Sequence, residues 1–309
     1  MRLVFLGSGR FAVPSFEALL DAGHDVAAVV TQPDRRAGRG RGNAPPPVKP
    51  AAEARGVPVF QPQRIAAPDA VEALARLEPE LGVVVAYGQL LPRTVLDVPP
   101  RGLVNVHASL LPAYRGAAPI QWAVVNGETH TGVTTMLLDE GLDTGPLLLA
   151  RRTAIGADEN AAELQERLAP LGAEILIETL EGLAGGTVLP QPQDHARASR
   201  APLIRKEDGR IDWTRPAAEL ACRVRGFFPW PGSTTTLAGQ HLKVLRAAVA
   251  APGPGEPGLL VAFEHEGMVV ACGGETRLRL IEVQPANRRP MPARAFASGA
   301  RLVTGDRLR

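Results

Sequence analysis

The sequence predicts a large α/β domain with a mostly parallel sheet, followed by a small all-β domain. The first observation is the opening of the chain, where buried apolar runs at Arg2–Gly7 and Asp25–Thr31 flank helical apolar spacing at Phe11–Leu20. Such a strand–helix–strand unit is typical of parallel sheets covered by helices. The second observation is a set of short alternating segments towards the carboxyl end, separated by Gly and Pro, which indicates a small β-barrel or sandwich. A length of 309 residues leaves room for both domains.

Further elements of the first domain follow from the same patterns. Strands are expected at Pro58–Phe60, Leu81–Ala86, Leu103–Ser109, Thr131–Leu138 and Pro146–Ala150. Helices are expected at Val48–Gly56, Ala70–Leu77 and Asn160–Leu183, the last capped by Asp158 and kinked or broken at Pro170 and Gly172. Ligands of such folds bind at the carboxyl ends of the strands, so Tyr87 and Leu90, just after Ala86, are candidate pocket walls. Ordinary loop packing is the alternative for both.

The second domain follows a stretch rich in proline and polar residues. We interpret residues 185–204 as a linker between a first domain of residues 1–184 and a second of residues 205–309. A short helix is expected near Ala217–Arg225. Strands are expected at Ser233–Leu237, Leu242–Ala248, Met268–Ala271 and Arg277–Val283.

Charge divides unevenly along the chain. Residues 203–309 carry 16 Lys and Arg against 10 Asp and Glu, a balance of +6, whereas the rest carries 18 against 22, a balance of −4. The basic carboxyl-terminal part favours a polyanionic partner, although a solvated basic face would have the same composition. Cys222 and Cys272 lack metal-ligand spacing and read as reduced thiols, and no stretch suits a membrane helix or a secretory signal. We expect a cytoplasmic protein without a membrane partner, and nothing in the sequence favours an oligomer over a monomer.

Three polar residues in the middle of the chain combine into a candidate catalytic set. Asn105 and His107 alternate along the strand LVNVHAS, together with Ser109, and so share one face. Asp143 lies in the tight turn GLDTG. An Asn amide can donate to an oxyanion, a His exchanges protons near neutral pH, and an Asp orients that His and stabilises its charged form. The structural alternative is a core histidine and an ordinary turn aspartate.

Other site chemistries fit the sequence less well. Ser109 lacks the G-x-S-x-G context of a hydrolase nucleophile. The remaining histidines are scattered without metal-ligand spacing, so no metal is expected. The turn at Gly7–Gly9 invites a dinucleotide interpretation, but Ala12 replaces the third glycine and no acidic residue ends the second strand.

The motifs NVHASLLP, RGAAPIQ and GLDTG together resemble the catalytic core of the folate-dependent formyltransferases. TQPDRRAGRG near the start and FFPWPG near the end extend this resemblance over nearly the whole chain. It implies a Rossmann-like formyltransferase domain, an OB-like barrel, and 10-formyltetrahydrofolate as a co-substrate that is not permanently bound. It also implies Asn105, His107 and Asp143 as catalytic residues. The resemblance implies that Ser109, Leu110, Leu111 and Pro112 line the folate site, and the candidate pocket walls Tyr87 and Leu90 would complete that site around a flat pterin ring.

The acceptor that the resemblance implies is the α-amino group of methionine on initiator methionyl-tRNA. Three features favour it: RGAAPIQ after SLLP, the arginine-rich loop and the basic tail with PWP. Four arginines on this glycine-rich loop suit contacts to tRNA phosphates, because they are always charged and can bond in a bidentate way: Arg35, Arg36, Arg39 and Arg41. In family members that act on tRNA the corresponding loop reaches the acceptor end, and the resemblance carries this role over to Arg39, in the matching GRG. The alternatives are a solvated loop, a formyltransferase for a small amine or sugar nucleotide, and a non-catalytic RNA-binding protein on a degenerate enzyme scaffold. The turn Ser8–Arg10 departs from the Thr-Pro-Glu usual in the family, and its role is left open.

Overall fold

The computed structural model describes residues 1–36, 43–237 and 239–309 and divides into two compact units. The first unit comprises Met1–Pro119, His130–Ala154 and Gln165–Pro202. The second comprises Ile120–Thr129, Ile155–Leu164 and Leu203–Arg309.

The first unit is built on a seven-stranded sheet with the order β10-β9-β7-β6-β1-β2-β5. Its strands are β1 (Arg2–Gly7), β2 (Asp25–Val30), β5 (Val59–Phe60), β6 (Leu81–Val85), β7 (Leu103–His107), β9 (His130–Leu137) and β10 (Leu147–Ala154). Neighbouring strands pair in parallel along β5, β2, β1, β6 and β7. The pairs β7–β9 and β9–β10 are antiparallel. The predicted Rossmann-like, mostly parallel sheet is therefore confirmed.

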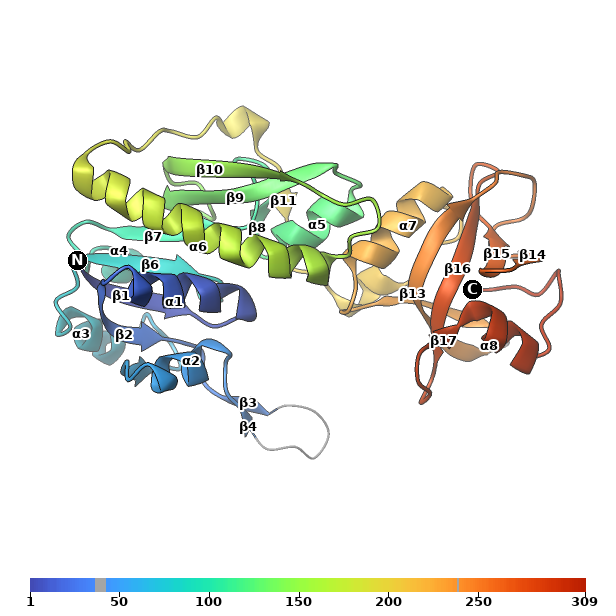
Figure 1. The fold of residues 1–309 in the computed structure, drawn as a ribbon, viewed down its shortest axis with the longest axis horizontal. Coiled ribbons are helices and arrows are strands. Elements are labelled where there is room, and N and C mark those ends of the chain that lie inside the picture. The colour runs from blue at the N-terminus through green and yellow to red at the C-terminus, as the bar shows by residue number, and fades with distance from the viewer. Residues whose placement is uncertain (37–42, 238) are drawn as a thin grey trace. The chain divides into compact units, whose positions relative to one another are not determined.

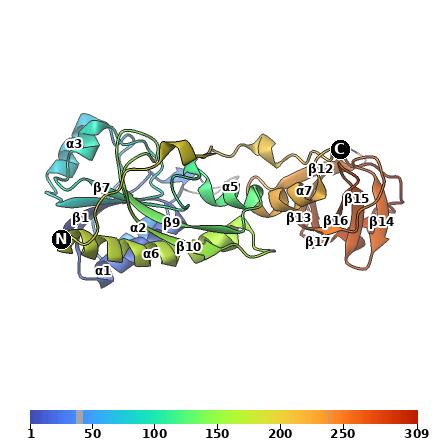
Figure 2. The same cartoon turned by 90° about the horizontal axis from the view of Figure 1, so that it is seen from above.

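Helices cover both faces of this sheet, because β1 alternates apolar side chains between them. Phe5 meets Phe16 of α1 with ring centroids 5.6 Å apart, while Val4 and Leu6 belong to a core cluster that includes Leu74 of α3. Figure 2 shows α1, α2 and α6 on one face and α3 on the other (Figures 1 and 2). The helices of this part are α1 (Val13–Asp21), α2 (Val48–Ala54), α3 (Pro68–Ala75), α4 (Arg93–Leu96) and α6 (Ala161–Gly185).

Helix α6 runs unbroken through Pro170, so of the predicted kink or break the break was wrong. An interior proline costs about 3 kcal/mol. The helix buries apolar side chains completely, including Leu168, Leu176 and Leu180, each worth about 1.5–3 kcal/mol. Burial outweighs the lost hydrogen bond. The glycine has a separate role, because a Cβ on Gly172 would lie only 3.1 Å from Cγ1 of Val106 on β7, so glycine allows the close approach of the helix to this strand.

The amino-terminal cap of α6 is Asn160, and not the predicted Asp158. The Oδ1 atom of Asn160 accepts from the amides of Ala162 and Glu163 at 2.9 and 3.0 Å. The Glu163 carboxylate accepts from the Asn160 amide at 2.9 Å. This reciprocal arrangement satisfies donors that the helix itself leaves unpaired.

The second unit contains an antiparallel sheet with the order β12-β13-β16-β15-β14, and β17 pairs with β16. Its strands are β12 (Ser233–Leu237), β13 (Gln240–Ala250), β14 (Leu260–Glu264), β15 (Gly267–Ala271), β16 (Arg277–Pro285) and β17 (Met291–Pro292), with helices α7 (Ala217–Gly226) and α8 (Ala293–Gly299). The four predicted strands and the helix α7 are present. The sequence pattern missed β14, β17 and α8.

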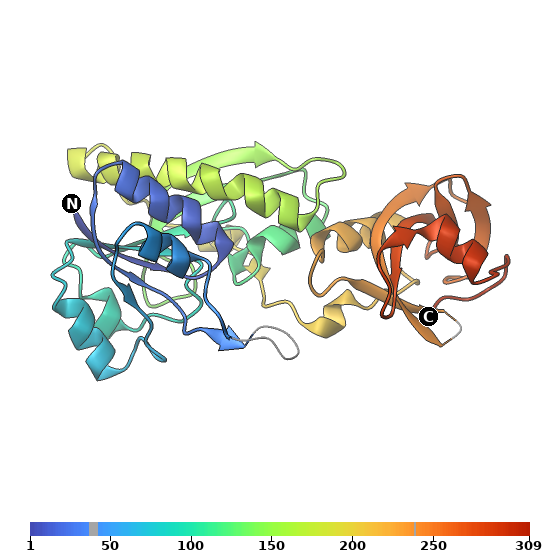
Figure 3. The same ribbon diagram turned by 60° about the horizontal axis from the view of Figure 1, so that its bottom comes forward.

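The carboxyl-terminal residues close this sheet into a barrel. The Arg309 backbone exchanges hydrogen bonds of 2.7 and 2.9 Å with Thr236 of β12. On the opposite edge, the Leu308 amide donates to Gly258 O and the Leu260 amide donates to Asp306 O, both at 2.8 Å. Closure removes the open edges that an isolated sheet would expose. Figure 3 shows the strands of this unit curving round.

Short elements complete the chain: β3 (Arg35–Arg36) pairs with β4 (Asn43–Ala44), β8 (Arg115–Gly116) pairs with β11 (Arg200–Ala201), and α5 spans Pro119–Val125. Within the second unit, the α5 residue Trp122 packs edge-on against Phe227, with centroids 6.0 Å apart. In the described ranges, no helix combines the length and apolarity that crossing a bilayer requires.

Candidate active site

Asn105 and His107 lie at the carboxyl end of β7, between β6 and β9. Only 9% and 6% of their surfaces are exposed. The side-chain amide of Asn105 has no hydrogen-bond partner among the described residues and is therefore available to a ligand. Ser109 lies beyond the strand end and is fully buried, and its hydroxyl donates to Ala113 O at 2.6 Å. The structure therefore brings the first two residues together and uses Ser109 to hold the next turn.

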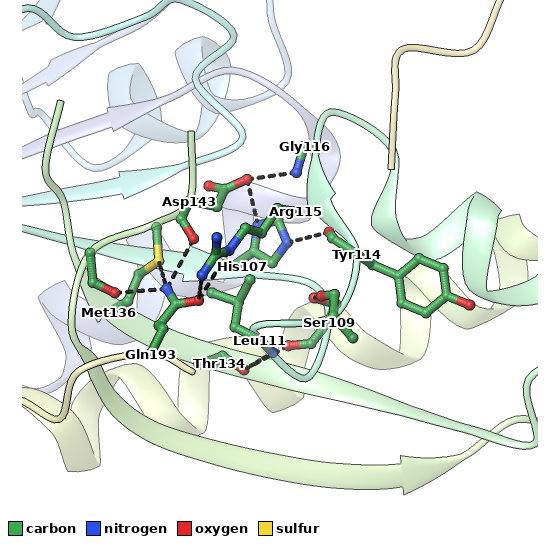
Figure 4. A network of polar contacts seen from close by, with 12 residues as sticks. His107, Ser109, Leu111, Tyr114, Arg115, Gly116, Thr134, Met136, Asp143 and Gln193 are labelled. Atoms are coloured by element: carbon green, nitrogen blue, oxygen red, sulfur yellow. Dashed lines mark hydrogen bonds and ion pairs between the residues drawn. The ribbon is translucent and has the colours of Figure 1, made fainter. Parts of the chain in front are cut away.

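The His107 ring is oriented by a backbone carbonyl. Nε2 lies 3.0 Å from the oxygen of Tyr114, which can only accept, so Nε2 carries the proton of this hydrogen bond (Figure 4). Tyr114 has a φ of +59°, in the left-handed region of backbone conformation. Nδ1 then faces Oδ2 of Asp143 at 3.7 Å, too far for a hydrogen bond. Sequence reasoning predicted that Asp143 orients the ring and missed Tyr114, because a carbonyl has no sequence signature.

Asp143 is partly buried beside His107, and 11% of its side chain is exposed. Its Oδ2 accepts from the amide of Gly116 at 2.7 Å, and its φ is +54°. A Cβ on Gly145 would collide with the backbone oxygen of Leu137, so this position of the turn requires glycine. The carboxylate can stabilise a charged imidazole across the 3.7 Å gap by electrostatics.

The turn that carries Asp143 is held by Gln193, which sequence reasoning missed. Nε2 of Gln193 donates to the backbone oxygens of Asp143 and Gly145 at 2.9 and 2.7 Å. Oε1 of Gln193 accepts from Nε and Nη2 of Arg115 at 3.1 and 2.6 Å (Figure 4). Gln193 is 6% exposed. It belongs to the stretch that we interpreted as a linker, and no local pattern distinguishes it there.

The SLLP turn is fastened to β9 by Thr134. The Thr134 hydroxyl donates to Ser109 O at 2.7 Å and accepts from the Leu111 amide at 3.1 Å. Leu111 is buried, whereas Leu110 and Pro112 are partly buried. The four residues of the predicted folate segment thus form one fixed turn beside His107.

The two predicted pocket walls after β6, Tyr87 and Leu90, differ in how far their side chains are exposed. Tyr87 is 2% exposed and packs in the core, where burial raises the pKa of its hydroxyl to about 12. Leu90 is 81% exposed. Only Leu90 offers its side chain freely to solvent.

The Ser8 hydroxyl ties three strand ends together and gives the first turn a structural role. It donates to Tyr87 O at 3.1 Å and accepts from the Thr31 hydroxyl and the Gln32 amide at 3.2 and 3.1 Å. These bonds join the carboxyl ends of β1, β2 and β6. A cavity of about 360 Å³ opens there; its walls include Ser8, Gly9, Gln32, Arg35, Pro45, Tyr87 and Gly88.

The four predicted tRNA-contacting arginines are only partly covered by the structure. Arg35 is exposed on β3, and its Nη2 donates to Gln32 Oε1 at 3.2 Å. Arg36 lies on the same strand, and Arg39 and Arg41 lie outside the described residues. Over the ranges that the structure covers, no group of three His, Cys, Asp or Glu could hold a metal ion.

Several solved structures share this fold. HypX from Aquifex aeolicus, in complex with tetrahydrofolic acid, has a TM-score of 0.63 and 19% identity over 96% of this chain and 47% of that chain. An N-formyltransferase from Helicobacter canadensis, in complex with folinic acid and dTDP-3-aminofucose, has a TM-score of 0.69 and 17% identity over 90% of this chain and 98% of that chain. At these identities the similarity establishes the fold alone.

Sequence comparison is more specific. The chain is 52% identical to the methionyl-tRNA formyltransferase of Solibacter usitatus, over 100% of this chain and 98% of that protein. It is 47% identical to the methionyl-tRNA formyltransferase of Geobacter sulfurreducens, over 100% of this chain and 96% of that protein. Residues 1–180 match the formyl transferase family and residues 203–301 match the formyl transferase carboxyl-terminal domain. The chain therefore belongs to the formyl transferase family.

Proposed function

We propose that this chain transfers a formyl group from 10-formyltetrahydrofolate to the α-amino group of methionine on initiator methionyl-tRNA. The product is N-formylmethionyl-tRNA, which serves translation initiation. The observation that carries the proposal is the buried His107, whose Nδ1 faces the Asp143 carboxylate, together with the Asn105 side-chain amide two residues away, which has no hydrogen-bond partner among the described residues. Family membership and full-length relatives named methionyl-tRNA formyltransferase support the same reaction.

The three side chains match the steps of amine formylation. The amine nitrogen attacks the formyl carbon, the bond from that carbon to the folate nitrogen breaks, and the amine proton passes to the leaving nitrogen. His107 carries this proton at Nδ1, since Nε2 is engaged by the Tyr114 carbonyl. Asp143 stabilises the charged ring meanwhile. Asn105 donates to the oxyanion, a contact whose loss costs about 10²–10³-fold in rate.

The proposed folate site combines Tyr87 and Leu90 with the turn Ser109–Pro112. Leu90, 81% exposed, offers an apolar surface to a flat ring. Ser109 and Leu111 shape the turn from inside, through their bonds to Ala113 and Thr134. The co-substrate binds reversibly, and the reaction calls on no metal.

The proposed domain roles follow from charge and from the family match. Residues 1–184 would perform the chemistry, residues 185–204 would link the domains, and residues 205–309 would bind tRNA together with the loop arginines Arg35, Arg36, Arg39 and Arg41. The excess of +6 from residue 203 onward suits a polyanion, because cationic contacts to phosphates dominate nucleic-acid affinity.

The experiment is a formyl-transfer assay with 10-formyltetrahydrofolate and charged initiator tRNA, with uncharged tRNA and glycinamide ribonucleotide as controls. We expect product with the charged tRNA only. Product with the small amine would retain the catalytic residues and overturn the acceptor. Absence of product with every acceptor would overturn the enzymatic proposal.

A further inference from the structure

Trp230 is a tryptophan that the core of the second unit does not use. Its surface is 57% exposed, although tryptophan is highly buried on average. Trp213 of the same unit is 5% exposed, and its Nε1 donates to the Thr235 hydroxyl at 3.1 Å. The exposed indole therefore contributes little to folding and offers a flat apolar face to a ligand.

The turn that carries Trp230 is anchored on both sides. Phe227 is fully buried, and its oxygen accepts from the Gly232 amide at 2.9 Å. Gly232 has a φ of +76°, which glycine adopts without strain. Pro231 is buried and packs against Gly209. The backbone that carries the Trp230 ring is therefore held in one place, which lowers the entropy lost when a ligand binds the ring.

Two exposed cationic residues lie on segments that border this turn. Thr234 pairs with Lys243 and forms a bridge with Arg210. Both cations are exposed, and within the described part of the chain neither forms an ion pair. The Lys243 stem passes close to the turn, since its Cδ lies 3.9 Å from where a Cβ of Gly232 would stand.

We propose that Trp230 stacks on an unpaired nucleotide of the RNA substrate while Arg210 and Lys243 contact neighbouring phosphates. The proposal rests on the proposed function, which supplies the RNA. Aromatic side chains stack on any base, and cations beside them hold the backbone. The charge argues for RNA and against a protein partner, because residues 203–309 carry an excess of +6.

The first test measures the affinity of the full chain for charged tRNA. Loss of a base–aromatic stack costs about 1–3 kcal/mol, so Trp230→Ala is expected to weaken binding about 10-fold and Trp230→Phe far less. Leu203→Ala is the matched control, because Leu203 is an exposed apolar side chain of the same unit, with 71% exposure. Lys243→Ala should lower the dependence of affinity on salt, whereas Trp230→Ala should leave that dependence unchanged.

The second test follows tryptophan emission in the folded protein. Stacking should quench part of the emission when tRNA binds, and Trp230→Phe should remove that part. Equal quenching in Trp230→Phe and wild type, or an unchanged affinity in Trp230→Ala, would overturn the stacking proposal. Formyl transfer by the wild-type chain is assayed separately. If the chain is active but Trp230 does not affect tRNA binding, only the stacking proposal is wrong. If Trp230 stacks on tRNA but the chain transfers no formyl group, only the proposed function is wrong.

Discussion

The side-chain nitrogen of Gln193 lies 2.9 Å from the backbone oxygen of Asp143, and the same nitrogen lies 2.7 Å from the oxygen of Gly145. One buried amide therefore holds both sides of the turn that presents the carboxylate. Its oxygen accepts from Arg115, so the amide is satisfied at both ends. A buried polar group paired in this way is rigid, because losing any partner would leave an unpaired donor or acceptor.

Replacing Gln193 with Leu should misplace Asp143. The change keeps the size of the side chain and leaves two backbone oxygens unpaired, at about 1–3 kcal/mol for each buried group. We expect kcat to fall at least about 10-fold while KM for tRNA changes little, as measured by steady-state formylation. Gln191→Leu is the control, because Gln191 is exposed on the same stretch. Equal losses in both variants would argue against a positioning role.

Replacing His107 with Ala should abolish turnover and preserve tRNA binding. The reason is that the proposed mechanism carries the amine proton on Nδ1 beside Asp143, whereas the proposed tRNA contacts come from the arginine loop and the basic carboxyl-terminal part. Single-turnover formylation and tRNA affinity measure the two quantities separately. His265→Ala, at an exposed position of β14–β15, should behave as wild type. Near-normal turnover in His107→Ala would remove this residue from the mechanism.

Replacing Asn105 with Ala should lower kcat by about 10²–10³-fold with little change in KM. An oxyanion donor acts in the transition state and hardly in the ground state. Steady-state kinetics with charged tRNA separate the two parameters. A rise in KM at constant kcat would instead assign Asn105 to substrate binding.

Replacing Gly145 with Ala should destabilise the first unit and reduce activity. The new Cβ would collide with the backbone oxygen of Leu137, and overpacking typically costs about 1–3 kcal/mol. Thermal unfolding and formylation measure both effects. Gly185→Ala is the control, because a Cβ at the end of α6 meets nothing within 4 Å. Similar melting temperatures for the two variants would contradict the packing argument.

Replacing Tyr87 with Phe should stabilise the protein at neutral pH and flatten its alkaline unfolding. The buried hydroxyl has no partner among the described residues, and burial raises its pKa to about 12. The native state thus holds the neutral phenol, so this group leaves the free energy of unfolding independent of pH below the unfolded pKa of about 10 and lowers it as pH rises towards 12. Urea unfolding of both proteins at pH 7 and above pH 10 tests this. A less stable Tyr87→Phe variant at pH 7 would show that the hydroxyl is paired.

Local patterns in the sequence predicted most of the elements because such patterns repeat with the period of the backbone. The alternation of LVNVHAS placed Asn105 and His107 on one face, and the apolar runs located the parallel strands. The pattern failed at Pro170, where burial of a helix face outweighs a missing hydrogen bond, and at Asp158, where the neighbouring Asn160 makes the cap.

Only the tertiary structure decided what holds the candidate site together. The orientation of His107 depends on the Tyr114 carbonyl, the turn of Asp143 depends on Gln193, and the barrel depends on the backbone of the last residues. The sequence by itself determined the chemical groups and the strand that presents them. It left out their partners because backbone oxygens look alike at every residue, and because contacts between distant segments form only when the whole chain packs.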